Sequence, residues 1–215
     1  MRTIQKGREP RSLLQYRMSA DAHYDGYQDK QDVRVQLVEE QRGLCCYCQS
    51  RIRATPAGMK IEHWQSQSPK KYPERQLDYT NMLGACLGGH KNGERSPRDR
   101  HHCDTLKGDA DLCFCLTDRD RPIEGHLHFL GDGRIKSDVP EIQRDIDEVL
   151  RLNIAHLQEN RKAVLKAFQQ CLIRGKPLDV SRELPKWDGT QAGELPEFAQ
   201  VVVYLLRKRQ ARGAA

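Results

Sequence analysis

The sequence lacks an apolar run long enough to cross a membrane. Its longest apolar stretches, such as VVVYLL at 201–206, are far shorter than the roughly 20 residues that a transmembrane helix needs. The N-terminal stretch MRTIQKGREPRSLLQYR contains no apolar segment of the kind found in secretory signals. Internal repeats and low-complexity segments are absent too. These absences argue against a membrane protein and predict a cytoplasmic location.

The excess of basic over acidic residues is modest. The 215 residues include 36 Lys and Arg against 30 Asp and Glu, which gives a formal charge of +6. A basic balance fits a polyanionic partner, because Lys and Arg release counterions from nucleic-acid phosphates. A solvated basic surface explains the same charge. The length allows one large domain or two small ones.

Hydrophobic spacing predicts an α+β protein whose first half contains a helix and two short strands. Residues 29–42 have helical spacing and run into a glycine, which favours a helix end. Residues 59–64 and 80–86 are typical of short strands. The glycine-rich, charged segment 87–100 predicts a surface loop, and 101–109 contains the start of a short helix.

The second half is predicted to be mainly helical. A hairpin is expected where HLHFL and RIK flank GDG at 131–133, since glycine supplies the positive φ of a tight turn. Apolar stripes predict a helix that begins near Pro140, a second that is capped by Asn153 and stops at Gly175, and a last one from Pro196. We expect these stripes to face the core or a partner.

Eight cysteines in a reducing compartment indicate metal ligands or catalytic groups rather than disulfides. Cys45 and Cys48 form a C-x2-C pair, whose tight turn suits one edge of a tetrahedral zinc site. Cys86 and Cys103 bracket the glycine-rich loop and would complete a four-cysteine knot; buried cysteines without a metal are the alternative. The competing zinc ligands are His90, His101 and His102. The cysteines expected to be ordinary small side chains are Cys46, Cys113, Cys115 and Cys171.

Between the two halves of this knot lies the stretch IEHW, in which Glu62 precedes His63. A histidine near neutral pKa can take a proton from water, and a neighbouring carboxylate can hold a hard divalent cation. In a regular strand the two side chains point apart, but a twisted strand end lets both reach one cleft. The alternative is a pair of surface residues, the commonest fate of such a dipeptide.

The pattern GLCCYC…IEHW…LDYTNMLGAC…CDTLKGD, within residues 41–109, resembles the HNH endonucleases and their ββα-metal motif. The resemblance implies that Glu62 and Asp104 hold a catalytic Mg2+ or Mn2+, that His63 is the general base and that Asn81 braces the loop holding His63. Two departures stand out. The second cysteine pair is separated by sixteen residues instead of two, and aspartate replaces the more frequent Asn or His at position 104.

More narrowly, MRTIQKGREP, CDTLKGD and the following helical region resemble the HNH proteins of Septu and retron-associated anti-phage systems, which work with an ABC or SMC-like ATPase. The resemblance implies three segments. Residues 1–40 form a lead-in, 41–118 an HNH core with its zinc knot, and 119–215 a hairpin with helices that dock a partner. The predicted protein is a metal-dependent nuclease that cuts DNA in preference to RNA; a zinc-knuckle binding module that cuts nothing is the alternative.

Basic residues close in sequence to the predicted site are candidates for phosphate contacts, and a solvated loop is their other interpretation. These residues are Lys107, Arg98 and Arg100, together with Lys91 and Arg95. Tyr47 and Trp64 could stack on bases, but packing around the knot is favoured.

Overall fold

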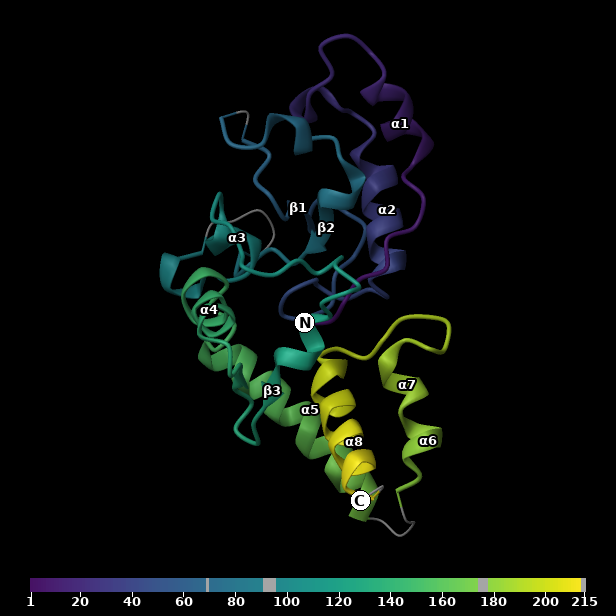
Figure 1. Cartoon of the computed structure of the whole chain (residues 1–215), viewed down its shortest axis with the longest axis vertical. Helices are drawn as coiled ribbons and strands as arrows, with labels where there is room; N and C mark the ends of the chain where they lie inside the picture. The colour runs from purple at the N-terminus through teal and green to yellow at the C-terminus, as the bar shows by residue number, and fades with distance from the viewer. Residues whose placement is uncertain (69, 91–95, 174–177, 214–215) are drawn as a thin grey trace.

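A computed structural model of the chain describes residues 1–68, 70–90, 96–173 and 178–213. Helices and two small antiparallel sheets make up an elongated α+β molecule, as predicted (Figure 1). One half contains α1, α2 and the first sheet, and the other contains the helices α5 to α8 (Figure 1). Among the described residues, no helix has the length and apolarity to cross a membrane.

The first half is built around α2 (Lys30–Glu40), which buries Val33 and Leu37 and precedes the predicted glycine turn. Gly43 has a φ of +75° and its N–H bonds to Val38 O at 2.8 Å, a conformation that suits glycine after a helix end. The helix α1 (Arg11–Arg17) and a single helical turn, η1 (Tyr24–Gly26), precede α2.

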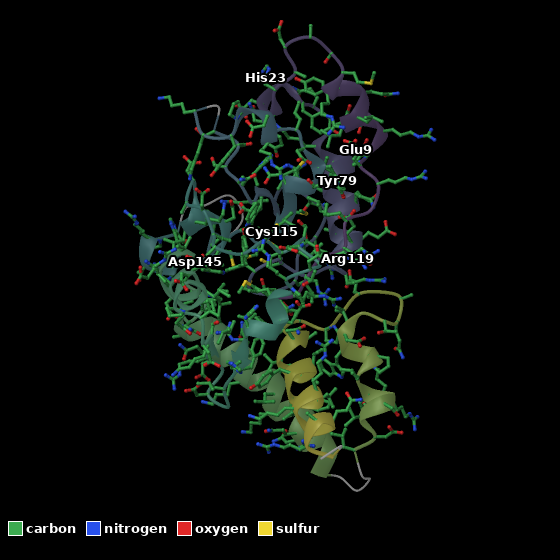
Figure 2. All side chains as sticks on the ribbon, viewed as in Figure 1. Glu9, His23, Tyr79, Cys115, Arg119 and Asp145 are labelled. Carbon is green, nitrogen blue, oxygen red and sulfur yellow. The ribbon has the colours of Figure 1, made fainter. Side chains whose placement is uncertain are left out.

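The two predicted strands are confirmed as β1 (Lys60–His63) and β2 (Met82–Ala85). They pair antiparallel, with His63 opposite Met82. The connection between them contains two short helical turns, η2 (Pro73–Arg75) and η3 (Tyr79–Asn81). The phenol of Tyr79, labelled in Figure 2, donates to Glu40 Oε1 of α2 at 2.8 Å and ties this connection to the helix.

The outer edge of β2 is covered by a side chain. The buried amide of Gln41 donates to Gly84 O at 2.8 Å and accepts from Gly84 N at 2.6 Å, as a neighbouring strand would. Cys46 N also donates to Gly84 O, at 2.9 Å. A Cβ at position 84 would come within 2.9 Å of Ile52 Cδ1 and 3.2 Å of the Gln41 amide nitrogen, so a larger residue would require the ends of these side chains to shift.

After β2 the chain forms the predicted hairpin and helices. A short helix, α3, follows Cys103 directly. Two further helical turns, η4 and η5, lie before the hairpin, and a π-helical segment, η6, follows α4. Their bounds are η4 (Arg98–Arg100), α3 (Asp104–Lys107), η5 (Ile123–His126), β3 (His128–Phe129), β4 (Ile135–Lys136), α4 (Pro140–Arg144), η6 (Asp145–Val149), α5 (Ala155–Ile173), α6 (Val180–Glu183), α7 (Pro185–Asp188) and α8 (Ala199–Gly213).

Three details differ from the sequence predictions. The last helix begins at Ala199 instead of Pro196, because Phe198 has a φ of +55° that a right-handed helix cannot include. Asn153 Oδ1 accepts from Ile135 N of β4 at 2.8 Å, so this side chain braces the hairpin instead of capping α5. Between α5 and the last helix the chain also forms α6 and α7, two short helices that the apolar stripes did not predict. The predicted stop at Gly175 lies outside the described residues.

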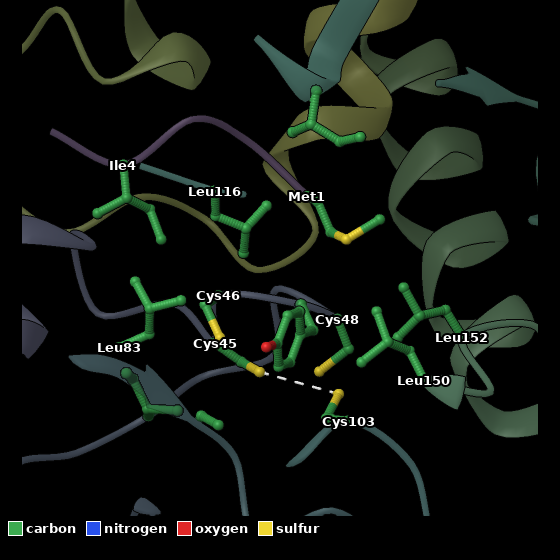
Figure 3. Packing of buried hydrophobic residues seen from close by; sticks show 14 of the residues in the cluster. Met1, Ile4, Cys45, Cys46, Cys48, Leu83, Cys103, Leu116, Leu150 and Leu152 are labelled. Atoms are coloured by element: carbon green, nitrogen blue, oxygen red, sulfur yellow. Dashed lines mark hydrogen bonds between the residues drawn. The ribbon is translucent and has the colours of Figure 1, made fainter. Parts of the chain in front are cut away.

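The main hydrophobic core runs through both halves. It includes Met1, Leu37 and Leu83 from the first half and Leu150 and Val201 from the second. Figure 3 shows Leu83, Leu150 and Leu152 around the cysteines. The predicted division at 40 and 118 therefore crosses a shared core, and it stays a prediction.

Candidate metal centre and active site

Four cysteines from three parts of the chain meet in one buried cluster. Their sulfur atoms all lie within 4.8 Å of one another. The closest pairs are Cys48 with Cys86 at 3.7 Å and Cys45 with Cys103 at 4.0 Å, the second drawn in Figure 3. These are the four residues that the sequence nominated, despite the long insertion between the last two.

The geometry and chemistry of the cluster fit zinc. With Zn–S bonds of about 2.3 Å, the sulfurs of a tetrahedral site lie about 3.8 Å apart. Burial alone would raise the pKa of Cys45, but hydrogen bonds from Cys103 and the other thiols lower it well below its ordinary value. A thiolate in this position is the form that binds zinc. Three of the four cysteines are buried, with Cys86 half-buried, which suits a closed structural site.

Of the three competing histidines, His102 lies nearest the cluster, with Nε2 at 3.7 Å from Cys86 Sγ. Its Nδ1 lies 3.0 Å from Arg100 O. His90 and His101 pack their rings against each other at 4.8 Å between centroids, and both contact Ser96. The geometry therefore favours four sulfur ligands, with His102 beside them.

Local backbone structure aims the sulfurs. Cys45 N donates to Ser50 O at 2.9 Å and Gln49 N donates to Cys45 O at 3.1 Å, which closes the C-x2-C turn. Cys103 has a φ of +53°, a strained value for a residue with a side chain. Its N–H is held by Leu150 O at 2.9 Å. This turn directs Cys103 to the cluster and starts α3 with Asp104.

Glu62, His63 and Asp104 line one cavity of about 400 Å³. The lining also includes Arg34 from α2 and Lys60 from β1. The end of β1 therefore lets both members of the Glu62–His63 pair reach the same space. Asp104 arrives from α3, directly after the last cysteine of the cluster, so the cluster and the cavity share a short piece of backbone.

Glu62 is buried between two donors. Tyr47 donates its phenol to Glu62 Oε1 at 2.7 Å, and Lys107 Nζ contacts the same oxygen at 2.9 Å. Burial, helped by the adjacent Asp104 carboxyl, raises the pKa of Glu62 well above its ordinary value, against the opposing charge of Lys107. Ionised Glu62 is thus costly here unless more positive charge is nearby.

Asp104 is the more easily ionised partner. Burial opposes its charge, but the hydrogen bond from Glu62 and the ammonium of Lys60 hold its pKa below the ordinary value. Lys60 Nζ lies 3.2 Å from Asp104 Oδ2. Two neighbouring carboxyls with pKa values pushed apart share a proton, and a divalent cation would replace that proton. Their hard oxygens suit Mg2+ or Mn2+, which are commonly held by one or two carboxylates with water and phosphate.

His63 is positioned to act as a base. Its Nε2 lies 3.0 Å from Gln76 O, so Nε2 carries the proton and Nδ1 keeps its lone pair. The Tyr24 ring and the imidazole pack in a T-shaped arrangement, with centroids 4.5 Å apart. Burial lowers the pKa of His63 to about 4. The ring is therefore neutral at physiological pH and can accept a proton.

Asn81 makes three hydrogen bonds to the connection that follows β1. Its Oδ1 accepts from Gln65 N at 2.8 Å, and its Nδ2 donates to Gln65 O at 2.9 Å and Arg75 O at 3.0 Å. The side chain is fully buried. Because Gln76 O contacts His63 and follows Arg75, these bonds fix the carbonyl that orients the imidazole.

The position of Lys107 contradicts the predicted phosphate contact. Its side chain is 0% exposed, and its ammonium contacts Glu62 and donates to His63 O at 3.0 Å. Burial with these partners leaves it unable to grip a backbone in solvent. Arg98 and Arg100 are exposed on η4, whereas Lys91 and Arg95 lie outside the described residues.

Both aromatic residues considered for base stacking are engaged within the protein. Tyr47 is fully buried and bonds to Glu62. Trp64 Nε1 donates to Phe114 O at 2.7 Å. Packing, the favoured interpretation, is thus what the structure shows for these two residues.

Sequence reasoning missed Arg34 of α2, which lines the cavity, and Tyr24 of η1, which packs on His63. Arg34 and Tyr24 belong to no motif, and only the fold brings them to His63. Lys60 was missed although it alternates with Glu62 on β1, a spacing that could have drawn attention to it. Within the described ranges, the four cysteines are the group of at least three residues whose ligand atoms lie close enough to hold one metal ion. In the cavity, Glu62 and Asp104 are the neighbouring carboxyls, and Asp109 also contributes to the lining.

Comparison with known proteins supports the predicted family. No family model matches the chain. The chain is similar to a protein of Escherichia coli named as a candidate HNH endonuclease of retron Ec83, at 22% identity over 239 aligned positions that cover 93% of this chain and 91% of that relative. The predicted resemblance to HNH proteins of retron-associated systems is confirmed by this name. The similarity also extends far beyond residues 41–118.

Proposed function

We propose that the chain is a metal-dependent HNH endonuclease that hydrolyses phosphodiester bonds, in DNA rather than RNA. The observation that carries the proposal is the convergence of Glu62, His63 and Asp104 on one cavity, with His63 neutral and its Nδ1 free to accept a proton. The named relative from retron Ec83 supports the same activity. A binding module has no need of a base beside two carboxylates.

The residues divide the chemistry between them. His63 Nδ1 takes a proton from the attacking water, and the Gln76 carbonyl stabilises the imidazolium that forms. Glu62 and Asp104 would hold the catalytic Mg2+ or Mn2+, which supplies stabilisation of the negative charge on the phosphate when bound. Asn81 holds the loop that orients His63. Cys45, Cys48, Cys86 and Cys103 would hold zinc and fix Asp104 against β1.

Cleavage by the purified chain tests the proposal. Supercoiled plasmid and total RNA are incubated with the wild type, with His63→Ala and with His126→Ala, an exposed histidine on η5, in Mg2+, Mn2+ or EDTA. We expect metal-dependent loss of plasmid, a rate at least about 100-fold lower for His63→Ala, and no change for His126→Ala. Cleavage that persists in EDTA or in His63→Ala would contradict the mechanism.

The biological setting we propose is anti-phage defence beside an ATPase subunit. The resemblance to retron-associated HNH proteins supports this setting. The helical second half, from β3 to α8, is the candidate docking region. We expect the chain to copurify with an ABC or SMC-like ATPase encoded beside it, and its cleavage activity to depend on that subunit. Cleavage at the same rate with and without such a subunit would contradict this part of the proposal.

A further inference from the structure

We propose that one edge of α2, formed by Lys30 and Arg34, binds the nucleic-acid backbone at the phosphate next to the one that is cut. The inference rests on the proposed nuclease function and adds the surface along which the substrate lies. It also moves the expected backbone contacts away from Lys107, whose ammonium is buried within the protein.

The two cations share a helix face, and each is linked to the surroundings of His63. Lys30 and Arg34 are four residues apart in α2, a spacing that places side chains one above the other. Arg34 lines the cavity of about 400 Å³ together with Glu62 and His63. Lys30 Nζ lies 4.6 Å from the ring centre of Tyr24, and the Tyr24 ring packs on His63.

Arg34 has hydrogen-bonding capacity that the described residues do not use. Its Nε is buried and has no hydrogen-bond partner among them. The nearby lysines differ, since Lys60 pairs with Asp104 and Lys107 pairs with Glu62. A buried guanidinium N–H without an acceptor is unfavourable, and a phosphate oxygen is the acceptor that a guanidinium fork fits best.

The cavity lining contains charges of both signs. Glu62, Asp104 and Asp109 supply negative charge, and the first two are the residues that would hold a divalent cation. Arg34 supplies positive charge from α2, and Lys30 extends it by one turn towards Tyr24. A backbone whose scissile phosphate sits at His63 can therefore place its next phosphate on α2. Contacts of this kind set position and affinity without reading base sequence.

Binding measured without cleavage tests this surface. The His63→Ala chain without added Mg2+ or Mn2+ serves as parent. A fluorescent DNA duplex and its single strand serve as probes, with anisotropy recorded over a range of salt concentrations. Arg34→Ala should weaken duplex binding roughly fivefold or more and reduce the salt slope by about 0.9, the value for one phosphate contact. Arg34→Lys should keep most of the slope, because the charge remains.

Arg209→Ala is the matched control, since Arg209 is exposed on α8 and does not line the cavity. Its slope should equal that of the parent. Thermal melting checks that each variant folds, and Lys30→Ala, at the first turn of α2, provides a second test if Arg34→Ala does not fold. Unchanged binding by both α2 variants, or no binding by the parent, would overturn the inference. If the α2 variants weaken binding but the wild-type chain never cuts nucleic acid, the binding surface on α2 would be supported and the proposed nuclease function contradicted.

Discussion

The cysteine cluster and the carboxylate cavity lie on either side of one peptide bond, yet they differ in nearly every property. The cluster contains four soft sulfur donors at distances of a closed tetrahedral site. The cavity, an open space of about 400 Å³, offers a neutral histidine and the hard carboxyls of Glu62 and Asp104, each paired with a lysine, with Asp109 also in its lining. Closed sites serve structure, whereas open ones leave room for water and substrate.

The difference indicates how the chain separates folding from chemistry. Cys103 takes the strained backbone conformation and is held in the core by Leu150 O. Asp104, the next residue, is thereby delivered to the cavity without needing to stabilise the fold itself. Changes in the cluster should therefore affect stability first, and changes in the cavity should affect metal binding and rate first.

The largest effect is expected from Cys103→Ser. In the proposed zinc site, losing one of four ligands removes metal-binding energy that is also folding energy, on the order of 10 kcal/mol in small zinc domains. The variant should lose its cooperative thermal transition by circular dichroism and its zinc by elemental analysis. Cys171→Ser, an exposed cysteine on α5, is the control. A Cys103→Ser chain that is folded without zinc would show that the cluster is not needed for folding.

Lys107→Met should destabilise the chain by about 3 kcal/mol, as expected when one partner of a buried ion pair is removed. Without Lys107, the pKa of Glu62, already raised by burial, rises further. Protonated Glu62 is tolerated in the fold, so the loss should be small at mildly acidic pH and grow as pH rises through the folded pKa. Urea unfolding at several pH values measures this, with exposed Lys162→Met as control. A pH-independent loss would contradict the account.

Asn81→Ala should cost about 1–3 kcal/mol, because the Gln65 amide and carbonyl and the Arg75 carbonyl lose their partner. The cleavage rate should fall by more than the loss of folded protein explains, because the Gln76 carbonyl that orients His63 is held less firmly. The rate and the urea midpoint are compared with those of Thr80→Ala, an exposed neighbour. If the cleavage rate of Asn81→Ala falls only in proportion to the folded fraction, Asn81 does not position His63.

The smallest effect on stability belongs to Lys60→Met. Its pair with Asp104 is partly exposed, with side-chain exposures of 35% and 20%, and such pairs contribute less than about 1 kcal/mol. Lys60 competes with a cation for the carboxylate, so the variant should bind Mn2+ a few-fold more tightly by calorimetry. Weaker Mn2+ binding would mean that Lys60 assists the site instead.

The sequence allowed prediction of those features that depend on spacing along the chain. The C-x2-C pair, the Glu62–His63 dipeptide and the strand periods around 60 and 83 identified the hairpin and the four cysteines that converge. Arg34 could not be found in this way, because nothing in its surroundings within α2 distinguishes it from other helix-surface arginines. The prediction for Lys107 was wrong for a different reason. A lysine close in sequence to a site is expected to be exposed to solvent, and only the fold reveals its buried partner, Glu62.

The short helices show the same limit at the level of the fold. α6 and α7 have four residues each, and proline and glycine lie near them. A single turn has too few positions to show a helical period, and its stability comes from packing. Leu184 and Trp187 pack near Phe168 and Val202, contacts that depend on α5 and α8 being in place.

The amide of Gln41 has a consequence for how this protein behaves at high concentration. A two-stranded sheet exposes unpaired backbone groups that can recruit a strand from another molecule. At the centre of β2, the N–H and C=O of Gly84 are already used by Gln41 and Cys46. A side chain thus acts as a permanent substitute for a third strand, and it protects the hairpin that carries Glu62 and His63 from aggregation through that edge.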